Sequence, residues 1–474
     1  MMNSIKKNFI YNSLYQILLI IIPLITAPYL SRNLGADGIG IFAYYYSIAN
    51  YFVLFIMLGV NNYGNREIAR AGQEKEELAH TFWSIYALQF SLGCLCSVLY
   101  IFYGLFISSD SQYALIMALY VLSGALDINW CFFGMEKFKF ITLRNIFIKL
   151  TTTVMILLLV KNKEDVGMYC LITAGGALVS QIAVWPYLLK NIGIYKPKIK
   201  EVLVHVKPNL YLFLTVLAVS IYKIMDKIML GTMTNTTQVG FYESSEKVIA
   251  IPTALITSLG TVMLPRMTSM VKNNDDQSSE TIRKSLILAM LMSSSMSFGI
   301  MGIAKTFVPF FYGEGYDACV DLFVILLPSC LFLSFANVIR TQYLLPHNMD
   351  KNYIISAFLG AGINFTINII LIPKLGAKGA AIGTLCAEAL VCSYQCFSVR
   401  KYLRIKKYII DSVPIIISGI TMFLLLFNLN LNFKSKLLEL AFLIVLGIVV
   451  YVTQIVIVFF IKKCIDKRKK ERKI

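Results

Sequence analysis

The sequence predicts an all-α polytopic membrane protein with about 14 transmembrane helices, each long enough to cross a hydrocarbon layer of roughly 30 Å. Three observations support this fold class: the recurring apolar stretches, the apolar composition and the placement of the basic residues. Hydrophobic residues make up 57% of the chain, and the mean hydropathy is +0.69. A soluble protein of this size could not hide so much apolar surface in one core.

The basic residues give the orientation of the spans. About seven Lys and Arg fall in the odd-numbered gaps and about thirty-one in the even-numbered gaps and at the termini, and basic residues stay on the cytoplasmic side. We therefore expect an even number of spans in the cytoplasmic membrane, with both termini inside. The expected spans lie near 9–31, 40–60, 81–107, 113–134, 145–160, 167–189, 209–231, 239–263, 285–311, 318–345, 353–373, 377–399, 409–430 and 437–461.

The net charge of +18 does not indicate a nucleic-acid partner. The basic residues form short clusters beside spans, such as Lys196, Lys198 and Lys200, and no gap is long enough for a folded soluble domain. We interpret them as topology signals and as contacts for anionic lipid head groups. The cysteines lack zinc-ligand spacing, and no phosphate-binding Gly-x-x-x-x-Gly-Lys-Ser/Thr motif occurs, so no metal or cofactor is expected.

A repeat appears at an offset of about 200 residues. Leu34-Gly35 followed by Gly40 resembles Leu230-Gly231 followed by Gly240, and each pattern joins the end of one span to the start of the next. Six spans per half is an even number, so the halves would enter the membrane in the same direction, as parallel repeats about an axis along the membrane normal. We expect an N-terminal lobe at 1–200, a C-terminal lobe at 201–400 with a cleft between them, and two extra lipid-facing spans with a basic tail at 401–474.

Several of these segments resemble a known family. The runs Leu34–Ser47, Arg66–Arg70, Asp226–Gly231 and Val239–Tyr242, with Leu264-Pro265 after them, are similar to polysaccharide transporters of the multidrug/oligosaccharidyl-lipid/polysaccharide exporter superfamily, and more closely to the O-antigen and capsular repeat-unit flippases. The likeness covers the whole chain. It implies a substrate, an undecaprenyl-pyrophosphate-linked oligosaccharide moved from the inner to the outer leaflet, and partners among membrane lipids, polysaccharide polymerase and chain-length machinery. We expect a functional monomer that is not an enzyme.

Charged residues inside spans are the candidate site, because an ionised group at mid-bilayer costs about 2.5–3.5 kcal/mol and normally faces a cavity or a partner. A pyrophosphate head would be bound by Arg forks and Lys point charges. Local pairing of Lys223 with Asp226, and of Glu243 with Lys247, is an equally good explanation for part of the set. Arg32 could equally serve only to anchor a helix end. The substrate-binding candidates are Arg340, Lys305, Arg32, Lys223, Lys227 and Lys247.

Carboxylates in the spans are candidates for coupling transport to a proton or sodium gradient. A lone buried carboxylate has a raised pKa and can exchange a proton or hold a cation. A neutral, hydrogen-bonded acid that holds helices together is the alternative. Asp127 and Glu388 have no basic residue three or four positions away. The full set of ion-coupling candidates is Asp127, Glu388, Asp226, Glu243 and Glu246.

Two other functions fit part of the pattern. A cation-coupled multidrug antiporter of the same superfamily would favour an acidic cleft, whereas Lys and Arg outnumber the acids in these spans. A membrane enzyme acting on lipid-linked glycans would need a catalytic outer loop, and the outer loops here are short. A passive scaffold is disfavoured by the cost of so many intramembrane charges.

Overall fold

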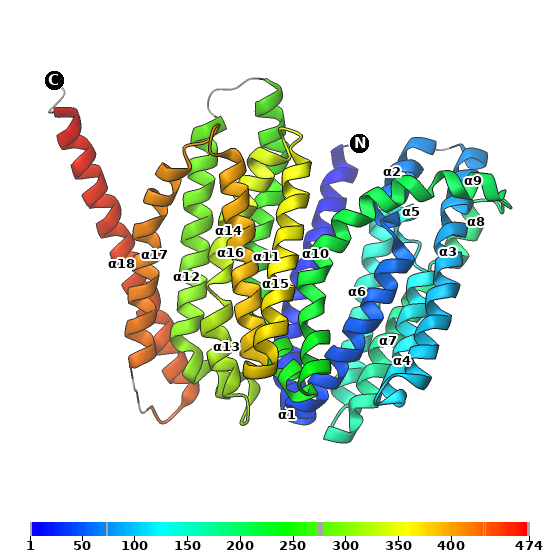
Figure 1. The fold of residues 1–474 in the computed structure, drawn as a ribbon, viewed down its shortest axis with the longest axis horizontal. Helices are drawn as coiled ribbons and strands as arrows, with labels where there is room; N and C mark the ends of the chain where they lie inside the picture. Colours follow the sequence, from blue (N-terminus) through cyan, green and yellow to red (C-terminus); the bar gives the residue numbers. More distant parts are fainter. Residues whose placement is uncertain (1, 73, 274–277, 430, 432, 472–474) are drawn as a thin grey trace. The chain divides into compact units, whose positions relative to one another are not determined.

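The computed structural model describes residues 2–72, 74–273, 278–429, 431 and 433–471, and regular structure in these ranges is entirely helical (Figure 1). The chain divides into two compact units, Met1–Glu243 and Ser244–Ile474. The first unit contains α1 (Met2–Met57), α2 (Val60–Ala71), α3 (Lys75–Phe106), α4 (Ser111–Ala125), α5 (Asn129–Gly134), α6 (Phe138–Leu159), η1 (Lys163–Asp165), α7 (Val166–Ile182), α8 (Trp185–Asn191), α9 (Ile199–Val204), α10 (Val206–Met233) and the start of α11 (Thr236–Lys272).

The second unit contains the rest of α11 and all later helices. These are α12 (Ser278–Tyr312), α13 (Ala318–Leu326), α14 (Ser329–Ile339), the π-helical turn η2 (Arg340–Leu344), α15 (Asp350–Leu375), α16 (Ala377–Val399), α17 (Ile405–Asn428) and α18 (Lys436–Glu471). The boundary at residue 243 groups α10 with the first unit and α17 and α18 with the second. The division at 200 and 400 stays a prediction.

The predicted fold class is confirmed. Twelve helical stretches in the described residues are long and apolar enough to cross a membrane. The first of these, Ile21–Ala71, contains the end of the first predicted span and the whole of the second, which are separated by a break at Gly35 with φ 70° and ψ 178°. The seventh predicted span lies in α10. A positive φ favours glycine, and the helix breaks at Gly35 for this reason. The helix continues through Pro23 and Pro28.

Three predicted spans contain interruptions that hydropathy did not reveal. The fourth is divided between α4 and α5, with Asp127 in the break, and the sixth is divided between α7 and α8. The tenth is divided between α13 and α14 and ends in η2. Broken helices expose backbone groups at membrane depth, where they must find partners in the protein. Asp127 is therefore part of a turn, and its carboxylate accepts a hydrogen bond from the Asn129 N–H at 2.9 Å.

The gap between the second and third predicted spans contains a helix. The gap at 61–80 contains helix α2, whose buried residues Tyr63, Gly64 and Ile68 recur at helical spacing. Their face packs on α3 and α5, and Gly64 lies so close to the Trp130 ring that a Cβ there would be 2.4 Å from it. Short amphipathic helices of this kind carry too little apolar length to be identified from hydropathy.

The two repeated turns meet each other in the first unit. A Cβ on Gly40 would lie 1.7 Å from the Thr236 carbonyl oxygen, and a Cβ on Gly240 would lie 1.8 Å from the Ala36 carbonyl oxygen. The two contacts are reciprocal. Gly40 corresponds to Gly240 and Ala36 to Thr236, at the offset of about 200 residues found in the sequence repeat. The Thr236 hydroxyl also donates to the Asp37 carboxylate. The repeat thus corresponds to a symmetric helix contact that only glycine allows.

α17 is more than a peripheral, lipid-facing helix. Its face containing Tyr408, Ile415 and Met422 is buried, and it packs on α12. Asp411 accepts hydrogen bonds from Arg283 of α12 at 2.7 Å and from Lys462 of α18. The second unit therefore ties its last two helices together through one nearly buried carboxylate.

Candidate functional site

A cluster of charged and aromatic side chains lies where α10 and α11 form a helical hairpin. The chain turns at Thr234 and Asn235. Residues that are equally far from this turn along α10 and α11 therefore lie opposite one another. Lys227 donates to the Glu243 carboxylate at 2.7 Å, and the Tyr242 hydroxyl donates to the Asp226 carboxylate at 2.7 Å. We call Tyr46, Asp226, Lys227, Tyr242 and Glu243 the Lys227 cluster.

The Lys227 cluster combines burial with charge. Asp226 is 1% exposed and Tyr242 is fully buried, while Lys227 and Glu243 keep a small exposed fraction. The pair of Lys227 with Glu243 joins two helices rather than residues three or four apart on one helix. The side chain of Lys223 lies outside the described residues. Such a pair is stable in a low-dielectric setting only if both charges stay together.

Tyrosines surround this ion pair. The charges of Lys227 and Glu243 both act on the Tyr46 hydroxyl, and Tyr46 shares a hydrogen bond of 3.1 Å with Tyr120 of α4. The Phe42 and Tyr169 rings lie 4.3 Å apart, one turn away from Tyr46 on α1. Aromatic faces beside a charged pair can stack on sugar rings.

A second polar network crosses the first unit at the break between α4 and α5. Arg144 of α6 donates to the Asn129 side-chain oxygen at 2.8 Å and to the Ser180 carbonyl at 2.9 Å, and it also donates to Asn145. The attraction of Arg144 reaches the Asp127 carboxylate. Asp127 thus has a basic neighbour after all, on another helix.

Sequence reasoning did not select Arg144. Its partners lie at unrelated positions on α5 and α7, and only the fold brings them together. One signal was available: Arg144 is a charged residue inside a helix that otherwise reads as a membrane span, Phe138–Leu159. An ionisable residue in such a helix is a functional candidate by default.

Arg340 lies in the second unit, at the π-helical turn. Its guanidinium donates to the Asn337 side-chain oxygen at 2.6 Å and lies 5.2 Å from the centre of the Tyr353 ring. Asn337 in turn donates to the Ile256 carbonyl of α11 at 3.1 Å. π-helical turns are frequent at functional sites, and this one carries the Arg340 guanidinium, which is held in place by Asn337.

The other predicted cations have structural contacts. Lys305 is exposed; it donates to the Phe427 carbonyl at the end of α17 at 3.1 Å and lies 4.0 Å from the centre of the Phe427 ring. Arg32 is exposed, and it donates to the Pro28 carbonyl at 3.4 Å. Glu246 and Lys247 are half-buried on α11 in the second unit. A role for any of these residues in substrate binding stays a prediction.

Glu388 lies on α16, near Cys330 of α14. It is 8% exposed and close enough to Cys330 and Cys392 to act on them electrostatically. Asn364 and Asn368 are fully buried on α15, and a Cβ on Gly383 would lie 2.2 Å from the Asn368 side-chain oxygen. The structure therefore brings together Asp226, Lys227 and Glu243, whereas Glu388, Arg340 and Lys305 each have separate surroundings.

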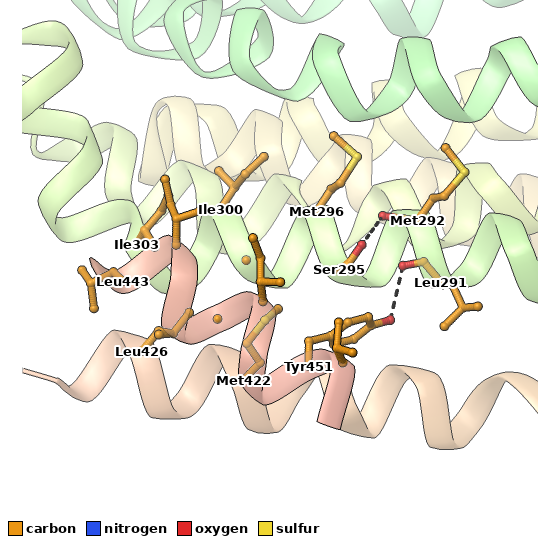
Figure 2. A pocket seen from close by; sticks show the side chains of 15 residues that line it. Leu291, Met292, Ser295, Met296, Ile300, Ile303, Met422, Leu426, Leu443 and Tyr451 are labelled. Atoms are coloured by element: carbon orange, nitrogen blue, oxygen red, sulfur yellow. Dashed lines mark hydrogen bonds between the residues drawn. The ribbon is translucent and has the colours of Figure 1, made fainter. Parts of the chain in front are cut away.

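An apolar groove of about 560 Å³ runs between α12, α17 and α18 (Figure 2). Met292, Met296 and Ile300 lie along one wall, and Met422 and Tyr451 lie along the other. The Tyr451 hydroxyl donates to the Leu291 carbonyl at 3.3 Å, so it presents little free polarity. A groove with this lining accepts hydrocarbon.

A solved membrane protein shares this fold. The chain superposes on the lipid II flippase MurJ, in an inward closed conformation, with a TM-score of 0.77 at 17% identity, covering 96% of this chain and 100% of that chain. Identity this low establishes the fold alone. Residues 5–271 match the family described as "Polysaccharide biosynthesis protein", and the chain belongs to that family.

Two curated relatives are similar over most of the chain. A protein named "Putative O-antigen transporter" from Escherichia coli (strain K12) is 27% identical over 403 residues, which is 84% of this chain and 97% of the relative. A protein with the same name from Shigella dysenteriae is 22% identical over 401 residues, or 83% and 100%. The sequence resemblance to polysaccharide transporters is thereby confirmed.

Proposed function

We propose that this protein is a flippase that moves undecaprenyl-pyrophosphate-linked oligosaccharide repeat units from the inner to the outer leaflet of the cytoplasmic membrane, for O-antigen or capsule synthesis. One observation carries the proposal: the chain belongs to a polysaccharide biosynthesis family, and most of it forms helices long and apolar enough to cross a membrane. The described connections between helices are short, so they offer no folded catalytic domain.

The Lys227 cluster is the proposed site for the polar head of the substrate in the first unit. The ammonium of Lys227 supplies a movable positive charge for pyrophosphate, and Glu243 neutralises that charge when the site is empty. Tyr46 and Tyr120 provide aromatic surface beside it. Arg340 is the proposed phosphate contact in the second unit, because its fork is held by Asn337 and is only half-buried.

The hydrocarbon chain of the substrate can remain in an apolar environment while its polar head crosses the membrane. The groove between α12, α17 and α18 is lined by Met, Ile and Leu side chains and suits a lipid chain. Alternating access would require the Gly40 and Gly240 contact to separate and re-form. We propose that this contact, with its Asp37 and Thr236 hydrogen bond, closes one side of the transport path.

Coupling to a proton or sodium gradient is assigned to the carboxylates Asp127, Asp226, Glu243, Glu246 and Glu388. Replacing each by its amide, one at a time, tests this assignment under a range of imposed gradients. Loss of the gradient dependence in one variant identifies the coupling residue. If every variant keeps the dependence of the parent protein, coupling through these acids is wrong.

Deletion of the gene followed by lipid extraction tests the proposed function itself. A flippase defect leaves complete lipid-linked repeat units on the inner leaflet, where the polymerase that acts on the flipped product cannot use them. Truncated glycans would instead indicate a glycosyltransferase. Normal lipid-linked intermediates together with lost drug resistance would indicate a multidrug antiporter.

A further inference from the structure

The first unit contains an aromatic cavity that the proposed transport function does not use. Its volume is about 520 Å³, and its walls include Trp83, Tyr86 and Phe90 of α3 and Trp185 at the start of α8. The cavity is open to the surface of the unit, and Pro197 also lines it. This residue belongs to the linker segment 192–205, which connects α8 to α10 and includes α9.

The aromatic cavity offers apolar faces. The indole N–H of Trp83 donates to the Gly193 carbonyl at 2.9 Å, and the indole N–H of Trp185 donates to the Leu126 carbonyl at 3.1 Å. A sugar buried here would lose its hydrogen bonds to water without replacing them at either indole. Hydrocarbon incurs no such loss, so the chemistry of the lining selects an alkyl chain.

The end of the cavity at the linker is positively charged. Lys196 and Lys198 flank Pro197, and both are exposed. The nearby Glu201 is engaged by the Tyr195 hydroxyl at 3.1 Å and by the Lys198 backbone N–H at 2.8 Å. The linker also exposes Ile194 and Ile199, which are 83% and 78% exposed. Exposed aliphatic side chains among lysines are typical of a segment in the head-group layer of a membrane.

The depth of the cavity distinguishes between two kinds of lipid. The interval from Trp83 to Phe90 along α3 is about 10 Å at the helical rise per residue, which lies within one leaflet of a hydrocarbon core of about 30 Å. A fatty acyl chain fits this depth. A polyprenyl chain is longer than one leaflet, whereas an acyl chain that lies along the cavity ends within the same leaflet.

We propose that the aromatic cavity binds one acyl chain of an anionic glycerophospholipid whose phosphate is held by Lys196 and Lys198. The bound lipid tethers the linker between α8 and α10 to the membrane surface. By the basic-residue pattern this surface is the cytoplasmic one. The proposal is independent of the transport function, because lipid binding is measured without any glycan substrate.

Tryptophan fluorescence provides a direct test. Two of the three Trp residues, Trp83 and Trp185, line the cavity, and the third, Trp130, is fully buried. The purified protein is reconstituted into vesicles containing phosphatidylcholine or phosphatidylglycerol with brominated acyl chains, which quench nearby indoles. We expect quenching to reach half its maximum at a lower fraction of brominated phosphatidylglycerol than of brominated phosphatidylcholine.

Four variants separate charge from cavity. Lys196→Gln with Lys198→Gln should weaken the preference for phosphatidylglycerol by about fivefold per lysine, whereas Lys200→Gln in the same linker should leave it unchanged. Ala87→Phe fills the cavity and should abolish quenching by either lipid. Val98→Phe, at an exposed position on α3, is its matched control.

Three results would overturn the proposal. Equal quenching by the two lipids in the parent protein would indicate ordinary boundary lipid. Unchanged quenching in Ala87→Phe would place the lipid elsewhere. Relief of quenching by added undecaprenyl diphosphate would assign the cavity to the substrate's own chain. If Ala87→Phe does not fold, the lysine variants and the undecaprenyl competition decide.

Discussion

At the scale of single residues, Arg144 shows how a membrane arginine can act through geometry rather than charge alone. Its guanidinium bonds the Ser180 carbonyl and the side chains of Asn129 and Asn145 at once, beside the Asp127 carboxylate. A lysine carries the same charge but cannot present a planar fork of donors. Replacing Arg144 by lysine therefore keeps the charge but loses hydrogen bonds.

We predict that Arg144→Lys lowers the unfolding free energy by about 1–2 kcal/mol and reduces transport, because at least one bond to Asn129 or Ser180 is lost. Thermal unfolding of the purified protein and a transport assay measure the two effects. Lys407→Gln, in a basic cluster on the surface, serves as the control and should change neither. Full stability and activity in Arg144→Lys would show that only the charge matters.

The ion pair between Lys227 and Glu243 gives a second prediction at this scale. Lys227→Gln removes this ion pair from the nearly buried Glu243 carboxylate, which should cost about 3–5 kcal/mol of stability. Adding Glu243→Gln to this variant replaces the carboxylate by a neutral amide and should restore most of the melting temperature.

Transport by the double variant then separates structure from function. If Lys227 binds the pyrophosphate, the stable double variant remains inactive. An active double variant would show that the pair only joins α10 to α11. Sequence alone left these alternatives open, because helical spacing indicates partners on one helix, whereas Glu243 lies on the helix after that of Lys227.

At the scale of elements, the sequence predicted the spans well and their interruptions poorly. Hydropathy averages over a window, so the turn at Asp127 and the helix α2 at 60–71 were invisible to it. The two glycine turns were found because they repeat. Their direct contact was not predicted, because an offset along the chain carries no information about distance in space.

The contact between the repeated turns predicts a sharp intolerance. Gly240→Ala places a methyl group 1.8 Å from the Ala36 carbonyl oxygen, so the helices must separate, and we expect a loss of about 1–3 kcal/mol or more. Gly362→Ala on α15 meets nothing within 4 Å and should be neutral or slightly stabilising. Equal melting temperatures for the two variants would contradict the close contact.

The linker predicts a pH response. His205 accepts or donates a hydrogen bond of 2.8 Å with the Tyr63 hydroxyl, and burial lowers the pKa of His205, although the Glu67 charge opposes this. The docked linker therefore favours neutral His205. The stability that neutral His205 gives to the docked linker is present above the ordinary histidine pKa of about 6.5. It is lost as the pH falls through the lower pKa that His205 has in the docked linker.

Hydrogen exchange of residues 192–205 measures this response. Exchange should be faster at about pH 5 than at about pH 7.5 after correction for the intrinsic rate, and His205→Gln should remove the difference. The pKa of Glu201 is lowered by its hydrogen bond from the Lys198 backbone, so its own contribution is lost only at more acidic pH. Faster exchange at the higher pH would reverse the proposed sign.

At the scale of the whole molecule, the account depends on a membrane fold whose polar residues are concentrated in a few buried clusters. The fold class and the family resemblance came from the sequence and are confirmed by the match over residues 5–271 and by the flippase fold. The partners of Arg144, Arg340 and Asp226 could not be predicted, since each contact depends on packing between helices. The proposed substrate is the claim on which the rest depends.

Transport in reconstituted vesicles tests that claim most directly. Undecaprenyl-pyrophosphate-linked oligosaccharide is incorporated into both leaflets, and a glycosidase outside the vesicles reports how much glycan becomes accessible with time. We predict that the protein exposes nearly the whole pool, whereas empty vesicles and the Lys227→Gln/Glu243→Gln variant expose only the outer leaflet. A folded parent protein that exposes no more glycan than empty vesicles would contradict the account.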